Sequence, residues 1–304
     1  MRTRKGLVHA ATRDYQLWIM ILPAIIVILI FNYIPMYGIQ LAFRDYDFSK
    51  GLTGGEWRGL AYFQQFIDSY LFTDLMRNTF LISLASIVLG FPAPIILALI
   101  LNQIRRKKMK QLMQTTVYLP HFISIIVLVG MLNVLLSAET GVVGHLMKAV
   151  GLGHINLLAS TSTFIPVYVL SDIWQHCGWN SIIYLAALST VDPQLYDAAR
   201  IDGASRWQTI RFVDIPALVP TIIILFILSM GNILSTGFEK IFLMQNSLNL
   251  PVSEVIATYV YKIGIVSSQF SLASAIGLFN TVINFIFLFA MNTISKRVSE
   301  TSLF

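Results

Sequence analysis

The sequence predicts an all-α integral membrane protein with six transmembrane helices and both termini on the cytoplasmic side. Its mean hydropathy is +0.71, 56% of its 304 residues are hydrophobic and only 12% are charged. A soluble domain carries about 25% charged residues. Six apolar segments are each close to the roughly 20 residues that cross a bilayer, so we expect a single transmembrane domain over residues 1–304. The predicted spans cover residues 17–41, 79–101, 116–137, 164–188, 217–236 and 271–292.

The distribution of lysine and arginine predicts the orientation of these spans. The two termini with the second and fourth connections hold 14 of the 21 basic residues, and the opposite connections hold 7. Basic residues are enriched in short cytoplasmic connections, which places both termini in the cytoplasm. The same bias accounts for the net charge of +6, which could otherwise suggest a nucleic-acid partner. The run Arg105–Lys110 fits a topology determinant, with contact to anionic lipid as a by-product.

The first apolar segment follows a basic N-terminus, as the apolar part of a signal peptide would. Its run from Leu17 to about Leu41 is longer than the about 7–15 apolar residues of a signal peptide, and no clear cleavage site follows it. We predict an uncleaved first transmembrane helix that Pro23 and Pro35 bend or end.

The first outer connection, about residues 42–78, contains an amphipathic aromatic stretch with Trp57, Tyr62, Phe63 and Phe66. Such a stretch favours a position at the membrane interface. The alternative is a docking surface for an external binding protein, and both roles are compatible with the same residues.

The fourth span is the most polar, and a polar side chain inside a membrane requires a local reason. Asp172, His176 and Trp179 lie within it, together with Trp174 and Asn180. Aromatic rings beside hydrogen-bonding groups suit a sugar, because its C–H face packs on a ring and its hydroxyls need directional partners. A glycine in the same stretch, residue 178, permits the close approach of another helix or a ligand.

The fifth and sixth spans carry further polar side chains. Ser229, Asn232 and Ser235 lie broadly on one face of the fifth span, and Asn280 and Asn284 form an i,i+4 pair in the sixth. Hydrogen bonds between helices of the bundle are the alternative explanation for all of these residues. The candidates for the substrate pathway are Asp172, His176, Trp179, Asn232 and Ser235.

A long polar passage at residues 192–216 separates the fourth and fifth spans. Asp192 can cap a helix whose first residue is Pro193, where a missing N–H costs nothing. Gly203 tolerates the left-handed conformation that ends a helix. We therefore predict a helix that begins at the cap and ends in a glycine elbow.

A second short helix is expected directly after the elbow. Ser205 followed by Gln208 has the spacing of a capping box, so the helix should run from about Arg206 to Val213. Two helices joined by a glycine elbow form a rigid protrusion.

The same passage resembles the EAA loop of bacterial ABC-importer permeases. That pattern is Glu-Ala-Ala, three residues, Gly, nine residues, Ile, one residue, Leu-Pro. It corresponds here to Tyr196–Ala199, Asp202–Ala204, Val213, Ile215 and Pro216. The conservative departures are Asp197 for Glu, Val213 for Ile and Ile215 for Leu.

Further motifs are similar to the oligo- and polysaccharide permeases of the carbohydrate-uptake, maltose-type class. They are Asn32–Gly38, Tyr118–Ser124 and Ser171–Trp174, and the resemblance covers nearly the whole chain. Alignment on the loop also brings four of these candidates near positions that contact sugar in the maltose-type permease. They are His176, Trp179, Asn232 and Ser235.

The resemblance implies a type I ABC-importer permease fold, a bacterial cytoplasmic membrane location and oligosaccharide import by alternating access. The implied partners are a second related permease, two cytosolic ABC ATPases and an external sugar-binding protein. ATP and Mg²⁺ would bind to the ATPases and not to this chain. Trp207 and Ile210 are expected to be buried and to brace the loop, whose coupling helix would sit in the ATPase groove. The coupling candidates are Leu195, Tyr196, Asp197, Ala198, Ala199, Asp202, Gly203 and Ala204.

The sequence lacks the motifs of a nucleotide-binding or hydrolytic enzyme. No G-x-x-x-x-G-K-[ST], H-E-x-x-H or G-x-S-x-G occurs, and the single Cys177 excludes a Cys-based metal site. We expect no catalytic or metal site. The alternatives to a sugar importer are an ABC permease for another solute such as a peptide, or an ion-coupled secondary transporter. The latter should show ionisable groups in several spans, but Asp172 is the only acidic residue that we place deep in one.

Overall fold

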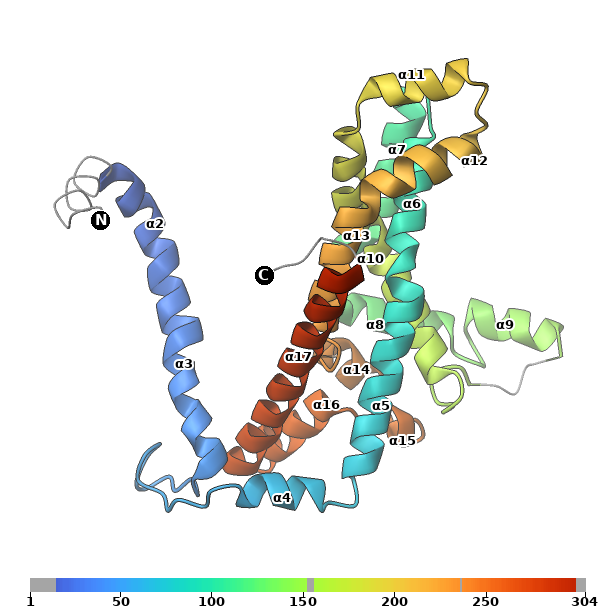
Figure 1. Ribbon diagram of the computed structural model, residues 1–304. Coiled ribbons are helices and arrows are strands. Elements are labelled where there is room, and N and C mark those ends of the chain that lie inside the picture. The colour runs from blue at the N-terminus through green and yellow to red at the C-terminus, as the bar shows by residue number, and fades with distance from the viewer. Residues whose placement is uncertain (1–14, 152–155, 236, 299–304) are drawn as a thin grey trace. The chain divides into compact units, whose positions relative to one another are not determined.

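The computed structural model describes residues 15–151, 156–235 and 237–298, and within these ranges the chain is helical (Figure 1). These ranges contain two isolated bridges, between Arg44 and Trp57 and between Asp47 and Gly51, and no strand. The predicted all-α fold is therefore confirmed. Both termini lie outside the described residues, so their cytoplasmic location stays a prediction.

The chain divides into two compact units. The first comprises Met1–Ile67 with Ile263–Leu278, and the second comprises Asp68–Lys262 with Phe279–Phe304. The helices of the first unit are α2 (Tyr15–Ile28), the π-helical turn η1 (Leu29–Tyr33), α3 (Ile34–Met36), the 3₁₀ segment η2 (Tyr37–Phe43) and α4 (Ala61–Ile67). Two elements cross from one unit to the other: the π-helical turn η6 (Lys262–Val266) and α17 (Phe270–Val298).

The first apolar segment forms one helical run of 29 residues, Tyr15–Phe43. Pro23 lies inside α2 without ending it, and the run tightens to 3₁₀ geometry two residues after Pro35. The apolar side chains from Tyr15 to Tyr37 are exposed, whereas Leu41 and Ala42 near the end of the run are buried. A lipid environment suits such a surface, as expected for a first transmembrane helix.

The aromatic stretch after this helix is packed. The Phe43 and Trp57 rings stack with centroids 5.6 Å apart, and the Tyr62 hydroxyl donates to Asp45 at 2.8 Å. Phe66 on α4 is buried, whereas Trp57 remains 64% exposed. The stretch thus has one packed face and one exposed face, which fits both roles left open by the sequence.

The second unit holds the remaining helices. The first group is α5 (Phe72–Ala85), the π-helical turn η3 (Ser86–Gly90), α6 (Pro92–Asn102), α7 (Lys107–Tyr118), the 3₁₀ turn η4 (Leu119–Phe122), α8 (Ile125–Leu135), α9 (Val142–Ala149) and α10 (Phe164–Ser189). The second group is α11 (Pro193–Ile201), α12 (Arg206–Thr209), the π-helical turn η5 (Ile210–Asp214), α13 (Ile215–Met230), α14 (Phe238–Met244), α15 (Leu250–Ser253) and α16 (Ile256–Tyr261).

Helix α10 is the centre of this unit because both of its halves lie in apolar clusters. Its first half contributes Phe164 and Val169 to a buried cluster with residues of α5, α8 and α14. Its second half contributes Tyr184 and Leu188 to a cluster with α6 and α13. The most polar part of the helix lies between the two clusters, and this arrangement positions the site described below.

In the part of the chain that the structure describes, four helical runs are long and apolar enough to cross a membrane: Tyr15–Phe43, Phe72–Asn102, Arg206–Met230 and Phe270–Lys296. A bent pair, Lys107–Phe122 with Ile125–Leu135, makes up to five. Helix α10 has 26 residues, sufficient length for a span, but its polar side chains lower its hydropathy. The structure thus supports four or five apolar spans, and the count of six stays a prediction.

Two of the predicted spans differ from continuous helices. The segment expected at 116–137 is bent by 96° between η4 and α8, where Pro120 lacks an N–H and Ser124 begins α8 as its cap. The segment expected at 217–236 is helical only to Met230, and residues 231–234 form a turn.

Candidate functional site

The polar passage after α10 has the local structure that its sequence predicts. The Asp192 carboxylate accepts a hydrogen bond from the Gln194 N–H at 2.9 Å, and Pro193 is the first residue of α11. Gly203 adopts φ +74°, the left-handed conformation expected at the elbow. Helix α11 and the start of α12 lie at the end of the unit where α6 finishes (Figure 1).

Hydrogen bonds fix the elbow on both sides. The Ala204 N–H donates to Ala199 at 2.8 Å and the Gly203 N–H donates to Arg200 at 3.1 Å, which is the Schellman arrangement. The predicted capping box is present, because the Gln208 N–H donates to Ser205 Oγ and the Ser205 N–H donates to Gln208 Oε1. The elbow is therefore a defined shape with few conformational alternatives.

The second helix does not stop near Val213 as expected. It continues through η5 into α13, so Arg206–Met230 is a single run of 25 residues. Pro216 and Pro220 cannot donate backbone hydrogen bonds, and the ladder changes to π-helical geometry just before them. The loop is therefore continuous with a helix that is long and apolar enough to cross a membrane.

The coupling candidates lie on α11 and on the elbow after it. Tyr196, Ala199 and Ala204 are half-buried, and the others are exposed. Leu195 is 54% exposed, and Asp197 pairs with Arg200 at 3.3 Å on the surface. We expected Trp207 to be buried and to brace the loop. This prediction is wrong, because the side chain is 67% exposed. Ile210 does pack against the cluster formed by α6, α10 and α13.

A buried carboxylate that we did not predict anchors this loop. Asp214 is fully buried, and its oxygens accept hydrogen bonds from the Tyr196 hydroxyl at 2.7 Å, Asn102 Nδ2 at 3.2 Å and Gln103 Nε2 at 2.8 Å. Asn102 Nδ2 also lies 3.4 Å from the Tyr196 oxygen. One side chain thus ties α11 to the end of α6 and to the start of α13.

The tyrosine in this network keeps its proton at physiological pH. Burial, and then the hydrogen bond to Asp214, raise the pKa of Tyr196 to about 12. A hydroxyl that donates to a buried carboxylate is a strong, charge-assisted hydrogen bond. The network therefore fixes Tyr196, at the centre of the EAA-like motif, to the transmembrane helices.

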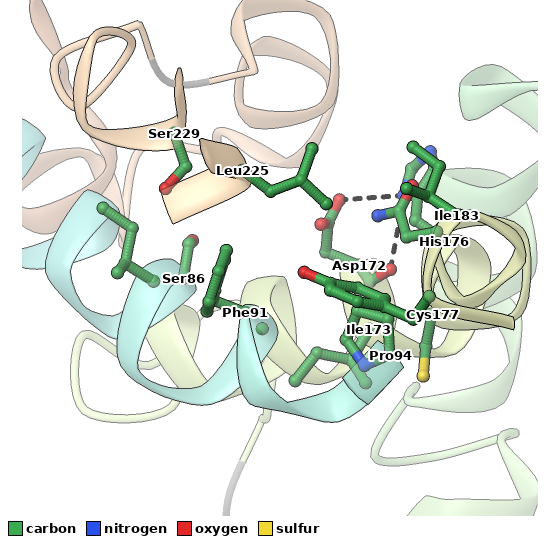
Figure 2. Close-up of a pocket in the computed structure, with 14 residues that line it drawn as sticks. Ser86, Phe91, Pro94, Asp172, Ile173, His176, Cys177, Ile183, Leu225 and Ser229 are labelled. Carbon is green, nitrogen blue, oxygen red and sulfur yellow. Dashed lines mark hydrogen bonds and ion pairs between the residues drawn. The ribbon is translucent and has the colours of Figure 1, made fainter. Parts of the chain in front are cut away.

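A cavity of about 320 Å³ lies between the two apolar clusters of the second unit. Residues from η3 and α6, α10 and α13 surround it (Figure 2). Its polar lining includes Asp172, His176, Asn180 and Ser229, and aromatic rings also line it, among them Phe91. Two of the five pathway candidates, Asp172 and His176, therefore share one cavity with an aromatic wall.

Asp172 and His176 belong to a charged cluster that includes a buried lysine. The His176 Nδ1 atom lies 3.3 Å from Asp172 Oδ1, and Lys240 Nζ lies 3.3 Å from the same oxygen. Lys240 is 3% exposed and also donates to the Tyr168 carbonyl at 3.1 Å. Sequence reasoning counted Lys240 only as an outer-connection charge. The lysine on α14 neutralises the carboxylate on α10, so the cavity wall carries no net negative charge from Asp172.

The other three pathway candidates lie outside the lining of this cavity. The Trp179 ring stacks on His121 with centroids 4.4 Å apart and planes 4° apart. Asn232 and Ser235 have exposed side chains and follow α13, whereas Ile233 and Leu234 between them are buried. They do not share a helical face, because α13 ends at Met230. The pathway role of all three stays a prediction.

The asparagines of α17 hydrogen-bond to the same segment. Asn284 accepts from the Leu234 N–H at 2.8 Å and donates to Ser235 Oγ at 3.0 Å. Asn280 Nδ2 lies 3.5 Å from the Leu234 carbonyl oxygen. These hydrogen bonds join α17 to the turn after α13, so the pair has a packing role close to the alternative explanation, although its partners are not helical.

Two further residues hold the polar half of α10 against the bend between α7 and α8. Gln175 is buried, and its Nε2 donates to the Ile123 carbonyl at 2.7 Å, which satisfies a backbone acceptor at the bend. A side chain at Gly178 would collide with the Val117 carbonyl, so α7 approaches α10 there. The sequence signal for Gly178 was visible, whereas Gln175 was not singled out.

The family comparison agrees with this arrangement. Residues 90–300, which include the loop at 192–216 and most of the cavity lining, match the family described as "Binding-protein-dependent transport system inner membrane component". The chain belongs to this family. Its members are subunits of binding-protein-dependent transport systems. This chain is therefore a multi-pass ABC-transporter permease, that is, a transporter subunit and not an enzyme.

Similar proteins cover nearly the whole chain. Protein LplB of Bacillus subtilis (strain 168) is 39% identical over 97% of this chain and 93% of its own length. The polygalacturonan/rhamnogalacturonan transport system permease protein YteP of the same organism is 38% identical over 99% of this chain and 94% of its own length.

Solved structures give the same result for the fold. A chain of a bacterial ABC transporter involved in the import of the acidic polysaccharide alginate has a TM-score of 0.87 and 38% identity, and the match covers 96% of this chain and 99% of the other. A second structure contains the bacterial alginate transporter in complex with an alginate pentasaccharide-bound periplasmic protein, with the same TM-score. The ABC-importer permease fold is therefore shown.

Proposed function

We propose that this chain is one of two permease subunits of an ATP-driven importer of acidic oligosaccharides in a bacterial cytoplasmic membrane. The observation that carries the ATP-driven part is α11, an exposed helix capped at both ends and tied through Asp214 to α6 and α13. A helix that binds an ATPase must present a firm surface and transmit force, and α11 has both properties. Loop displacement can thus bias the membrane helices between outward-open and inward-open states.

The proposed partners follow from the coupling surface and from the relatives. Two cytosolic ATPase subunits would hold ATP and Mg²⁺ and receive α11 of each permease. A second, related permease would complete the translocation path. An external saccharide-binding protein would deliver the substrate, as the structure of the alginate transporter with its periplasmic protein suggests by analogy.

The acidic character of the substrate is supported by the charge balance of the cavity. Asp172 alone would repel a uronate, but Lys240 and His176 both contact its Oδ1 atom. The Lys240 ammonium compensates the charge of the Asp172 carboxylate, so the cluster does not repel an anionic sugar. Two relatives with 38% identity act in the transport of acidic polysaccharides, polygalacturonan/rhamnogalacturonan and alginate.

Co-purification and ATP hydrolysis together test this function. The tagged chain, isolated from membranes, should bring down an ATPase and a second permease. ATP hydrolysis by the complex should rise when an oligogalacturonate-loaded binding protein is added, and a neutral maltooligosaccharide of equal length should stimulate it less. Gly203→Asp, at a position with φ +74°, should abolish the stimulation.

The outcomes separate the parts of the proposal. If the chain purifies alone and moves solute without an ATPase, the coupling function is wrong and an ion-driven mechanism replaces it. If the complex forms but responds equally to neutral and acidic oligosaccharides, only the substrate class is wrong. A response to peptides and not to saccharides would assign the importer to another solute.

A further inference from the structure

A groove of about 690 Å³ lies beside the coupling loop, where the end of α6, the start of α7 and the start of α12 meet. It is distinct from the substrate cavity, whose lining residues it does not share. Three of the chain's arginines and several large apolar side chains line it. None of the residues that line it is among the coupling candidates.

The position of the groove is at a membrane boundary. One apolar run, Phe72–Asn102, ends here, and another, Arg206–Met230, begins here. The bent pair also begins here, at Lys107. The ends of transmembrane helices lie at the level of the lipid headgroups. A ligand in this groove would therefore have one end in the headgroup region and the other in the hydrocarbon region.

The polar half of the groove is cationic. Arg105, Arg106 and Arg206 line it, and no carboxylate does. Within the ranges that the structure describes, none of the three guanidinium groups has a carboxylate at ion-pair distance. The planar guanidinium presents paired donors that match the oxygens of a phosphate. The groove thus offers three charge-assisted donors without an internal partner.

The other half of the groove is apolar. Ile104 and Met109 contribute aliphatic surface, and the exposed indole of Trp207 stands beside them. Tryptophan is enriched at the membrane interface because its ring is apolar and its N–H is polar. This explains why Trp207, which we expected to be buried, is exposed. The indole lines the groove and is not packed in the protein core.

We propose that this groove binds an anionic glycerophospholipid, with the phosphate against the arginines and an acyl chain along the apolar half. Charge complementarity excludes a zwitterionic lipid as the preferred occupant. A soluble phosphate would leave the apolar half uncovered. The bound lipid would hold α6, α7 and α12 together at the base of the coupling loop.

Lipid retention by the purified chain tests the proposal without reference to transport. The wild-type protein and three single variants, Arg105→Gln, Arg106→Gln and Arg206→Gln, would be purified in a neutral detergent after incubation with phosphatidylglycerol. Bound lipid would be counted by native mass spectrometry. Each arginine near a lipid surface contributes enough to lower affinity about fivefold when it is removed. A fourth variant that combines all three changes should lose about a hundredfold in affinity for phosphatidylglycerol, with phosphatidylcholine binding unchanged.

Matched controls have the same change in charge outside the groove. Lys108→Gln and Arg211→Gln each remove one positive charge from the same region of the chain without altering the lining. Both should retain phosphatidylglycerol as the wild type does. Trp207→Ala should weaken the binding of the two-chain lipid and leave the weak binding of glycerol phosphate unaffected.

Three results would overturn the proposal. The first is equal loss of phosphatidylglycerol in the control variants, which would show a diffuse surface charge effect. The second is full displacement of the lipid by glycerol phosphate at equal concentration, which would show a phosphate site without an acyl-chain contribution. The third is unchanged lipid binding with loss of a co-purified ATPase, which would make the groove a protein-docking surface.

Discussion

Tyr196→Phe removes one hydrogen bond to the buried Asp214 carboxylate and leaves the aromatic ring in place. The bond is 2.7 Å long, the shortest of the three that Asp214 accepts from side chains. A hydrogen bond to a charged group contributes about 1.5–3 kcal/mol. We therefore expect the variant to lose about 2 kcal/mol in the free energy of unfolding.

Replacing the acceptor should cost more than removing one donor. Asp214→Ala leaves Tyr196, Asn102 and Gln103 without their shared partner, and a buried polar group that loses its partner costs about 1–3 kcal/mol. The expected loss is about 4 kcal/mol. In that background Tyr196→Phe should have almost no further effect, so the double-mutant cycle should give a coupling energy of about 2 kcal/mol.

The assay has a stability part and a coupling part. Denaturation of the chain in lipid nanodiscs measures the loss of stability, and substrate-stimulated ATP hydrolysis by the assembled complex measures coupling. The Tyr196→Phe complex should keep basal hydrolysis and lose most of the stimulation, because α11 is no longer held to α6 and α13. Tyr70→Phe, at a side chain that is 88% exposed, is the matched control.

The raised pKa of Tyr196 adds a pH dependence with a defined sign. The folded value of about 12 lies above the ordinary value of 10.0, so the stabilisation is complete below pH 10 and is lost as the pH rises towards 12. The difference in stability between the wild type and Tyr196→Phe should be constant from neutral pH to about pH 9. The reasoning is refuted if Tyr196→Phe matches Tyr70→Phe in both stability and stimulation.

Three other changes test the remaining structural features. Gly178→Ala should destabilise the chain by about 1–3 kcal/mol, because the added Cβ collides with the α7 backbone. The control Gly130→Ala has open space around it and should be neutral or stabilising. Equal melting temperatures for the two variants would contradict this packing. Lys240→Met should cost about 1–3 kcal/mol by removing the charged hydrogen bond to Asp172. Asp172→Asn in the same chain should restore most of the loss, and no restoration in a denaturation experiment would show that the pair is not coupled. Gly203→Ala should cost about 1–2 kcal/mol through backbone strain alone, since nothing lies within 4 Å of the added Cβ. Gly203→Asn should cost less, because asparagine adopts the left-handed conformation more readily. An equal loss of stability and of stimulated hydrolysis in both variants would argue against a conformational role.

The features that the sequence predicted correctly are those decided by neighbouring residues. The cap at Asp192, the left-handed elbow at Gly203 and the capping box at Ser205 each depend on residues within about four positions. The apolar runs at 79–101 and 271–292 were also predicted, because the hydropathy of a span depends only on its own consecutive residues. Local chemistry is sufficient for such elements.

The features that the sequence did not predict depend on contacts between distant residues. Lys240 meets Asp172 across 68 positions, and Gln175 meets the Ile123 carbonyl across 52. Neither pairing has a local signal, because each side chain is ordinary for its own segment. The exposure of Trp207 was also missed, since an apolar ring next to a helix start is equally suited to a protein core and to a membrane interface.

The continuation of the second loop helix into α13 shows a different kind of error. Pro216 and Pro220 indicated an end to the short helix, but both prolines are accommodated in one run by a preceding π-helical turn. Proline in a transmembrane helix is tolerated where local adjustments satisfy the freed backbone groups. The sequence therefore located the irregularity correctly and misjudged its consequence.

ATP dependence of uptake tests the central claim most directly. Proteoliposomes containing this chain with its partner permease and ATPases would receive an acidic oligosaccharide on its binding protein, with or without ATP in the compartment that faces α11. The account predicts uptake only with ATP, and no uptake with Gly203→Asp although the complex still assembles. Uptake that proceeds without ATP, or that an ion gradient drives equally well in the variant, would contradict it.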